Sequence, residues 1–383
     1  MAAAIAGGAF ERSGAGGRHV SRRTWRWRPD RVLAALCGVL TGCASAPLVP
    51  FSTDTAPLIL VPAAQAGVQD KRGRFREIYC AVLAARAAEV PDHRPCDDAL
   101  TRLGSEPVPA GQPVPLGESS RHLVAAVVPG IGYSCFARWL QPQGTTDAHL
   151  AKYGYALTAI PVDALSGTTV NARQIRDWVM ARNPDPGAAR LVLVGYSKGT
   201  PDVLEAIVNH PEIRARVAAV VSVAGAVGGS PLANEAEQYQ ADVLQHFPGA
   251  ACDSGDGGGV ASLRPAVRRA WLAQNPLPSS VPMYSIVTLP RPERISSILE
   301  RTNRKLNQID GRNDSQMIFY DQLIPGSTLL GYLNADHWAV VVPIARTHDT
   351  IGSLFVTQNA YPREALTEAV LRFVEEDLAA RGK

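Results

Sequence analysis

The chain has 383 residues, enough for one large α/β domain or two small ones. Hydrophobic residues make up 46% of it and charged residues 19%, which is typical of a globular protein with a sizeable core and excludes a disordered chain. The formal net charge of +3 gives no reason to expect a nucleic-acid partner. Seven arginines and two acidic residues in positions 1–42 contribute +5, which leaves about −2 for the rest.

Residues 1–42 have the pattern of a secretory signal peptide. An arginine-rich stretch precedes the apolar run from Val32 to Leu40, which is too short to span a bilayer as a helix. The run ends in Leu40-Thr41-Gly42-Cys43, which resembles the lipobox of bacterial lipoproteins. That resemblance implies that Cys43 is lipidated and becomes the mature amino terminus. Ala44 then favours the outer membrane, so we expect a lipid-anchored protein on the periplasmic face of the bacterial cell envelope.

Four cysteines remain after the leader and the lipidated position are set aside. An even number of cysteines in an oxidising compartment predicts disulfide bonds. Cys80 and Cys96 form the local candidate pair, which would leave Cys135 with Cys252, although four cysteines allow three connectivities. No Cys-x-x-Cys or Cys/His grouping has the spacing of metal ligands, so we expect no metal site.

The segment between the leader and the first long strand is predicted to hold a tether and a small cap. Residues 43–71 are rich in Ala and Pro with few charges, which is typical of a tether. From Arg74 to Val90 the apolar residues follow helical spacing, and a proline-punctuated loop follows. We interpret residues 72–115 as an amino-terminal cap-like segment braced by Cys80 and Cys96.

From Arg121 onward, predicted strands and helices alternate, which favours a parallel sheet with helices on both faces. The alternation breaks at residues 230–282, which we interpret as an inserted cap with a Gly-rich run at 255–259. The expected strands are 123–128, 156–160, 191–194, 217–223, 283–289 and 331–334, and the expected helices are 134–153, 171–181, 201–208, 233–247, 264–273, 295–309 and 363–381.

One of these strands runs into a motif that carries chemistry. The apolar run Leu191–Val194 is followed by Gly195-Tyr196-Ser197-Lys198-Gly199, and a helical pattern begins at Pro201. Strand, G-x-S-x-G and helix form the context of a nucleophile elbow, in which the serine sits on a tight turn. The flanking glycines allow strand and helix to approach closely. Ser197 is therefore the candidate nucleophile.

A serine hydroxyl needs a base, and the base needs a third group to hold it. In elbow enzymes the acid and then the histidine follow the serine along the chain. His337 lies just after a predicted strand and is favoured over His348, which lies in a polar loop. We therefore predict His337 as the base.

The acid is expected on a loop between residue 289 and His337. Asp314 is favoured because Asn313-Asp314-Ser315 resembles the N-D-G-x-V loop that carries the acid in many esterases and lipases, with Ser315 where glycine is common. Asp310 and Asp321 remain open alternatives. Asp336 is the least favoured, because adjacent residues rarely point a carboxylate at the neighbouring ring.

An oxyanion requires two preorganised N–H donors. One donor is expected to be the backbone of Lys198, the residue after the nucleophile. The other is expected from the loop Pro129–Tyr133, which resembles the H-G-x-G oxyanion loop with proline in place of histidine. Ile131 is the first choice there, and Gly132 permits the turn. A dinucleotide fingerprint is disfavoured because the loop lacks a third glycine.

Together these motifs resemble an α/β-hydrolase of the esterase/lipase kind from about residue 121 to the end. The resemblance implies an α/β fold with a mostly parallel central sheet, formed by residues 72–383. It also implies that Ser197 attacks a small-molecule or lipid ester, forms an acyl-enzyme, and needs no cofactor. An acyltransferase of the same fold and a non-catalytic envelope lipoprotein that retains the fold are the alternatives.

Overall fold

The computed structural model describes residues 67–133, 135, 143–163, 165–182, 191–235 and 255–382. The predicted signal peptide, Cys43, most of the tether and the greater part of the helix expected at 233–247 lie outside these residues.

A mostly parallel sheet forms the centre of the fold, in the order β1-β8-β7-β6-β5-β3-β4. The neighbouring strands along this path are parallel, whereas β2 pairs with β8 in the antiparallel sense. Every residue of β6 is buried, as expected for an inner strand covered on both faces. The strands are β1 (Gln69–Asp70), β2 (Leu100–Thr101), β3 (Val124–Val128), β4 (Ala156–Ala159), β5 (Leu191–Tyr196), β6 (Val217–Val223), β7 (Met283–Thr288) and β8 (Thr328–Leu333).

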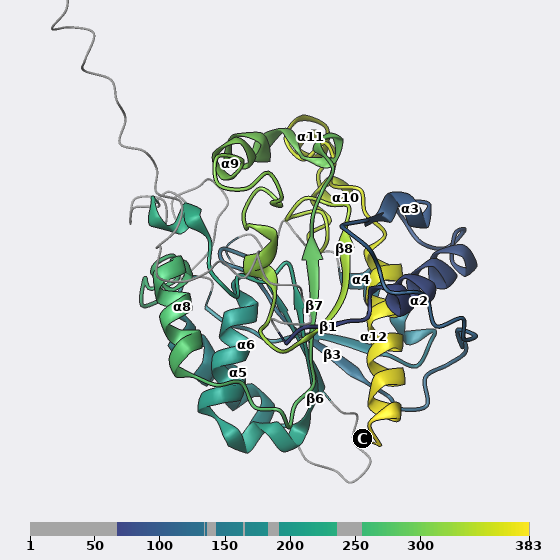
Figure 1. The fold of residues 1–383 in the computed structure, drawn as a ribbon, viewed down its shortest axis with the longest axis horizontal. Coiled ribbons are helices and arrows are strands. Elements are labelled where there is room, and N and C mark those ends of the chain that lie inside the picture. The colour runs from purple at the N-terminus through teal and green to yellow at the C-terminus, as the bar shows by residue number, and fades with distance from the viewer. Residues whose placement is uncertain are drawn as a thin grey trace, which may run out of the picture. The chain divides into compact units, whose positions relative to one another are not determined.

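Helices cover both faces of this sheet, as Figure 1 shows. Side chains of α5, α6 and α8 join one apolar core, and side chains of α2, α4 and α12 join the other. This arrangement confirms the predicted α/β-hydrolase fold class. The helices are α2 (Arg72–Ala85), α3 (Cys96–Ala99), α4 (Gln143–Ala151), α5 (Thr168–Met180), α6 (Gly199–Asn209), α8 (Pro265–Gln274), α9 (Glu300–Leu306), α10 (Ile344–Thr347), α11 (Asp349–Leu354) and α12 (Arg363–Ala380).

None of the helices in the described part of the chain has the length and apolar character required to cross a bilayer.

Residues 72–115 contribute helices α2 and α3 and strand β2 to the fold. Helix α2 packs against α12 and β8, and its Phe75 and Tyr79 are fully buried in the core. Residues 69 and 70, predicted as tether, pair with β8 at the edge of the sheet. The tether was predicted from composition, and a two-residue strand at its end leaves no periodic signal in the sequence.

A disulfide joins Cys80 of α2 to Cys96 of α3, which confirms the local pair. Cys135 is buried and also disulfide-bonded, while Cys252 lies outside the described residues. The pairing of Cys135 with Cys252 stays a prediction.

Candidate active site

Ser197 occupies the tight turn between β5 and α6, at a φ of +53°. Few residues other than glycine adopt this left-handed conformation, and strain of this kind is concentrated at functional sites. Both flanking glycines are required by close approaches. A Cβ on Gly195 would lie 2.5 Å from the Cα of Thr200, and one on Gly199 would lie 2.0 Å from the carbonyl oxygen of Val128. The turn therefore has the geometry of a nucleophile elbow.

His337 links Ser197 to Asp314. Its Nε2 lies 2.9 Å from the Oγ of Ser197, and its Nδ1 lies 2.7 Å from an oxygen of Asp314. When Nδ1–H donates to the carboxylate, the lone pair of Nε2 faces the serine hydroxyl. All three residues are buried, with Ser197 6% and His337 3% exposed. The arrangement can transfer a proton from the hydroxyl to the imidazole.

The carboxylate of Asp314 has further partners that fix its orientation. One oxygen accepts hydrogen bonds from the backbone N–H groups of Gln316 and Met317, at 2.9 and 2.7 Å. The other accepts from the Thr288 hydroxyl at 2.5 Å and from the Gln322 amide at 3.3 Å. Sequence reasoning missed Thr288 and Gln322. Their only signal was that Thr288 ends a strand beside the loop that carries the acid.

The alternative candidates have other partners. Asp310 forms an ion pair with Arg312 at 2.7 Å. Asp336 accepts backbone hydrogen bonds from Ser296, Trp338 and Ala339, and so shapes the turn that carries His337.

Two further candidates can also be placed. Asp321 lies against Gly228, whose backbone N–H donates to the Asp321 carbonyl at 2.7 Å. His348 lies between α10 and α11.

The loop Pro129–Tyr133 lies directly against the serine. A Cβ on Gly130 would lie 2.9 Å from the Cβ of Ser197 and 3.3 Å from its Oγ. Gly132 has a φ of +74°, which a side chain would strain. Ile131 packs on a small apolar cluster that borders this region, formed by Ala226, Ala233, Leu263 and Met317. The loop backbone is therefore close enough to take part in chemistry at Ser197.

The side chain of Lys198 is engaged in a buried ion pair. Its Nζ lies 2.8 and 2.9 Å from the two carboxylate oxygens of Asp202, and neither side chain is more than 1% exposed. Asn171 also donates to Asp202, at 2.8 Å. The ammonium is therefore paired with Asp202 of helix α6, so only the backbone N–H of Lys198 is considered as a donor to a substrate.

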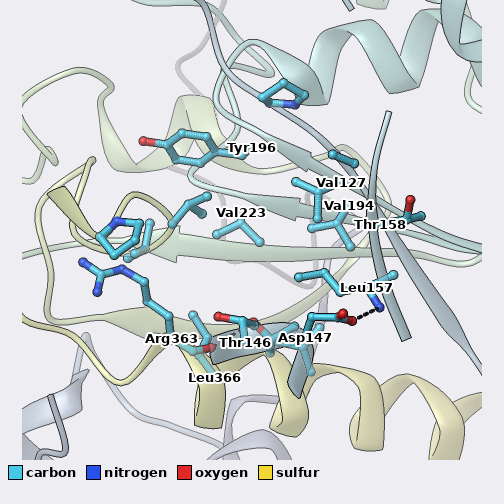
Figure 2. A pocket seen from close by; sticks show the side chains of 18 of the residues that line it. Val127, Thr146, Asp147, Leu157, Thr158, Val194, Tyr196, Val223, Arg363 and Leu366 are labelled. Atoms are coloured by element: carbon cyan, nitrogen blue, oxygen red, sulfur yellow. Dashed lines mark hydrogen bonds between the residues drawn. The ribbon is translucent and has the colours of Figure 1, made fainter. Parts of the chain in front are cut away.

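A cavity of about 330 Å³ lies between the sheet and helix α12 (Figure 2). Tyr196, which precedes the serine, and Pro129 and Tyr133 of the adjacent loop form part of its wall. Most of the remaining wall is apolar and comes from the strands and α12, including Ala125, Val127, Leu157, Val194, Val223, Leu366 and Val370.

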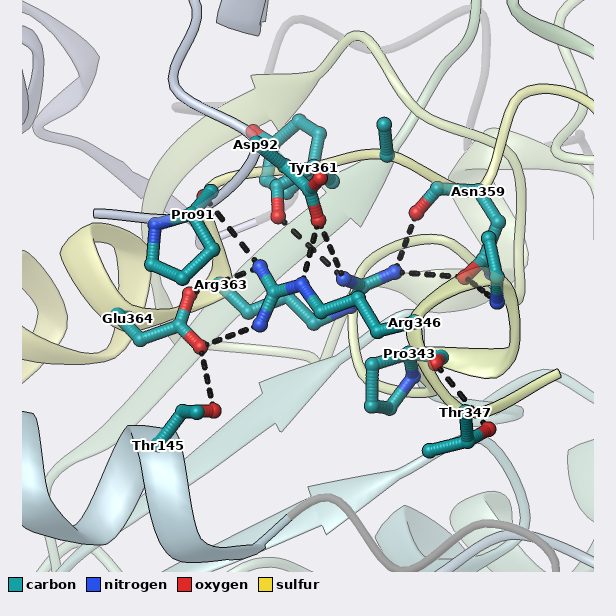
Figure 3. A network of polar contacts seen from close by, with 12 residues as sticks. Pro91, Asp92, Thr145, Pro343, Arg346, Thr347, Asn359, Tyr361, Arg363 and Glu364 are labelled. Atoms are coloured by element: carbon teal, nitrogen blue, oxygen red, sulfur yellow. Dashed lines mark hydrogen bonds and ion pairs between the residues drawn. The ribbon is translucent and has the colours of Figure 1, made fainter. Parts of the chain in front are cut away.

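A polar network ties the chain after His337 to α12 (Figure 3). Asp92 accepts from Arg346 at 2.7 Å and from Arg363 at 3.3 Å, and Arg346 also pairs with Glu364 at 2.6 Å. Burial lowers the pKa of Arg363 to about 10, so it stays charged at neutral pH. Through Arg346, the segment that follows His337 is therefore bonded both to Asp92 and to Glu364 of α12.

Among the described residues, no group of three His, Cys, Asp or Glu side chains could hold a metal ion.

The chain is similar in structure to a metagenomic carboxyl esterase, MGS0156, over 91% of its own length and all of that protein's, with 38% sequence identity and a TM-score of 0.78. It is also similar to the lipase of Staphylococcus hyicus, with 9% identity, a TM-score of 0.50, and coverage of 71% of this chain and 100% of that one. The latter likeness shows the fold alone. No protein-family model matches the sequence, and no curated protein does either.

Proposed function

Because the chain belongs to the carboxyl esterases of the α/β-hydrolase class and hydrolyses carboxylic esters, we propose that it does so through an acyl-enzyme on Ser197. His337 acts as the base, and Asp314 orients it. The observation that carries this proposal is the position of the His337 ring, within hydrogen-bond distance of both Ser197 and Asp314. This is the arrangement that a serine hydroxyl needs in order to become a nucleophile at neutral pH.

In the first half of the reaction, the Oγ of Ser197 attacks the ester carbonyl carbon while its proton moves to Nε2 of His337. The carbonyl oxygen becomes an anion, which the backbone N–H groups of Lys198 and Ile131 stabilise. When the tetrahedral intermediate collapses, the bond to the alcohol oxygen breaks. The leaving alkoxide then takes the proton from His337, and the acyl group stays on Ser197.

In the second half, a water molecule gives a proton to His337 and attacks the acyl carbon. The new tetrahedral intermediate collapses, the bond to Ser197 breaks, and the serine recovers its proton from His337. A carboxylic acid leaves. This chemistry needs only the side chains and backbone groups named here.

The surroundings favour an ester with an apolar portion, either a small molecule or a lipid. Pro129 and Tyr133 of the loop beside the serine, together with Tyr196, help to form a cavity whose walls are largely apolar. Burying apolar groups of a substrate on such surfaces contributes about 25 cal/mol per Å².

A fluorophosphonate probe and a series of aryl esters test the proposal on the full chain. We expect the wild-type protein to react with the probe and to release the aryl alcohol, and Ser197→Ala to do neither. Ser285→Ala is the matched control, because it removes a buried serine hydroxyl from strand β7. Equal labelling of the wild type and Ser197→Ala, with both folded by circular dichroism, would contradict the proposal.

We also propose that Cys43 carries lipid and anchors the enzyme in the bacterial envelope, on the periplasmic face of the outer membrane. The Leu40-Thr41-Gly42-Cys43 motif supports this, and the disulfide between Cys80 and Cys96 fits an oxidising compartment. Cell fractionation is the test. We expect the wild type in the membrane fraction and Cys43→Ala in the soluble fraction. Unchanged membrane association of the variant would exclude this anchor.

A further inference from the structure

We infer that Tyr196 is a positioning residue, whose hydroxyl holds the main chain of His337 while its ring supports the imidazole from one face. The inference rests on the proposed role of His337 as base. Tyr196 occupies the variable position before the serine in the elbow motif, which the proposed mechanism does not use.

The geometry shows two distinct contacts between Tyr196 and His337. The hydroxyl donates a hydrogen bond of 2.8 Å to the carbonyl oxygen of His337. The two rings stack with their centroids 5.3 Å apart and their planes at 28°. Adjacent residues of the elbow therefore contact the same histidine, Tyr196 through its main chain and ring face and Ser197 through its ring nitrogen.

The main chain of His337 is held at both of its polar groups. Its N–H donates to the carbonyl oxygen of Asp314 at 3.1 Å, and its carbonyl accepts from Tyr196. The acid loop thus fixes one side of the residue and the elbow fixes the other. Because the same two elements bear Asp314 and Ser197, these contacts set the distances on which proton transfer depends.

The hydroxyl bond matters because the tyrosine ring is not enclosed on every side. Tyr196 stacks on His337 and also forms part of the wall of the cavity (Figure 2). A ring that borders a cavity can reorient more easily than one packed all round. Burial raises the pKa of Tyr196 well above its ordinary value, so the phenol keeps its proton and donates throughout the working range.

Removing the hydroxyl should therefore loosen the base while keeping the aromatic ring that Tyr196 contributes to the cavity wall. A displacement of about 1 Å in a catalytic group can cost about a hundredfold in rate. We expect Tyr196→Phe to lower kcat about tenfold or more on an aryl ester, while KM stays within about twofold of the wild type.

Tyr361→Phe is the matched control. Tyr361 is fully buried and donates to the carbonyl oxygen of Ala99, also at 2.8 Å, so its variant loses the same kind of bond away from the reacting atoms. It also loses a longer bond of 3.3 Å from the Tyr79 hydroxyl, which makes the control the more severe change. A merely structural role for Tyr196 predicts that both variants lose stability and neither loses rate. Positioning predicts a fall in kcat for Tyr196→Phe alone.

Two measurements separate positioning from loss of fold. Titration with a fluorophosphonate counts active molecules, so unfolding lowers the number of sites, whereas poor positioning lowers the rate per site. Proton NMR follows the hydrogen between His337 and Asp314, whose downfield signal should broaden in Tyr196→Phe and stay sharp in Tyr361→Phe. A rate per site and an NMR signal equal to those of the wild type would overturn the inference. A wild type without esterase activity would instead refute the proposed function.

Discussion

Asp314 shares a hydrogen bond with His337 through one carboxylate oxygen, so the proposed role of Asp314 depends on both its charge and its acceptor character. Asp314→Asn keeps the size of the side chain but offers an NH₂ group that favours the wrong tautomer of the imidazole. We expect kcat to fall about ten-thousandfold with the fold intact. Asp310→Asn is the control, because Asp310 pairs with Arg312 instead. Near-normal kcat/KM for Asp314→Asn would show that another group orients the base.

Ser315 stands at a strained position beside this acid. Its φ is +79°, its side chain is buried, and its Oγ has no hydrogen-bond partner within the described part of the chain. This explains why related acid loops favour glycine there. We expect Ser315→Gly to raise the free energy of unfolding by about 1 kcal/mol, measured by urea titration, with unchanged kcat.

Ser315→Ala separates the effect of the left-handed backbone from that of the buried hydroxyl, because it removes the hydroxyl and keeps the backbone conformation. A destabilised Ser315→Gly variant would mean that the serine side chain contributes packing that outweighs the strain.

At the scale of elements, the disulfide between α2 and α3 fastens the segment that supports the site. Arg94, just before α3, donates to the carbonyl oxygen of Asn334, close to His337. Replacing Cys80 and Cys96 together with alanine should lower the free energy of unfolding by about 3 kcal/mol, the contribution expected of a disulfide that closes a loop of this length. Urea titration of this variant and of the wild type, both without a reductant, measures this, because a reductant would also open the disulfide of Cys135. Equal free energies of unfolding for the two proteins would contradict the expected contribution.

Long buried elements were predictable, whereas short ones were not. The apolar runs at 124–128, 191–196 and 217–223 are strands because inner parallel strands need buried side chains at every position. Strand β8 begins at Thr328, three residues before its predicted start, and the helix expected at 295–309 is reduced to 300–306. In both places polar residues and short turns break the periodic pattern that defines an element's ends.

The order of serine, acid and histidine along the chain left several candidate acids, and the likeness of Asn313-Asp314-Ser315 to a known acid loop selected the one that the fold brings to His337. The supporting contacts of Thr288, Gln322 and Tyr196 could not be predicted. Each depends on the packing of loops that leave different strands, and no spacing along the sequence encodes that distance.

At the scale of the whole molecule, we expect Asp321 to make stability depend on pH. Burial raises its pKa to about 7 from 3.8, an effect that Arg269 only partly offsets. Between these values the folded protein holds a proton that the unfolded chain has released, so stability falls as pH rises, by about 1.4 kcal/mol per pH unit. The penalty for burying the charged carboxylate is absent below pH 3.8, where Asp321 is protonated in both states, and is complete above pH 7.

Asp321→Asn carries no charge in either state, so we expect its free energy of unfolding to vary less between pH 4 and 8. Urea titrations at several pH values should show that the free energy of unfolding of the variant increases relative to that of the wild type as the pH rises. Parallel curves for the two proteins would mean that Asp321 is charged in the folded state.

The buried pairing of Lys198 with Asp202 also bears on how the enzyme could be attached to a solid support. Lys71, Lys152 and Lys305 are exposed, whereas the ammonium next to the nucleophile is sealed inside the fold. Amine-reactive resins should therefore couple through surface lysines and leave the elbow unmodified. Immobilised preparations should retain the turnover of the free enzyme even though a lysine lies beside its serine.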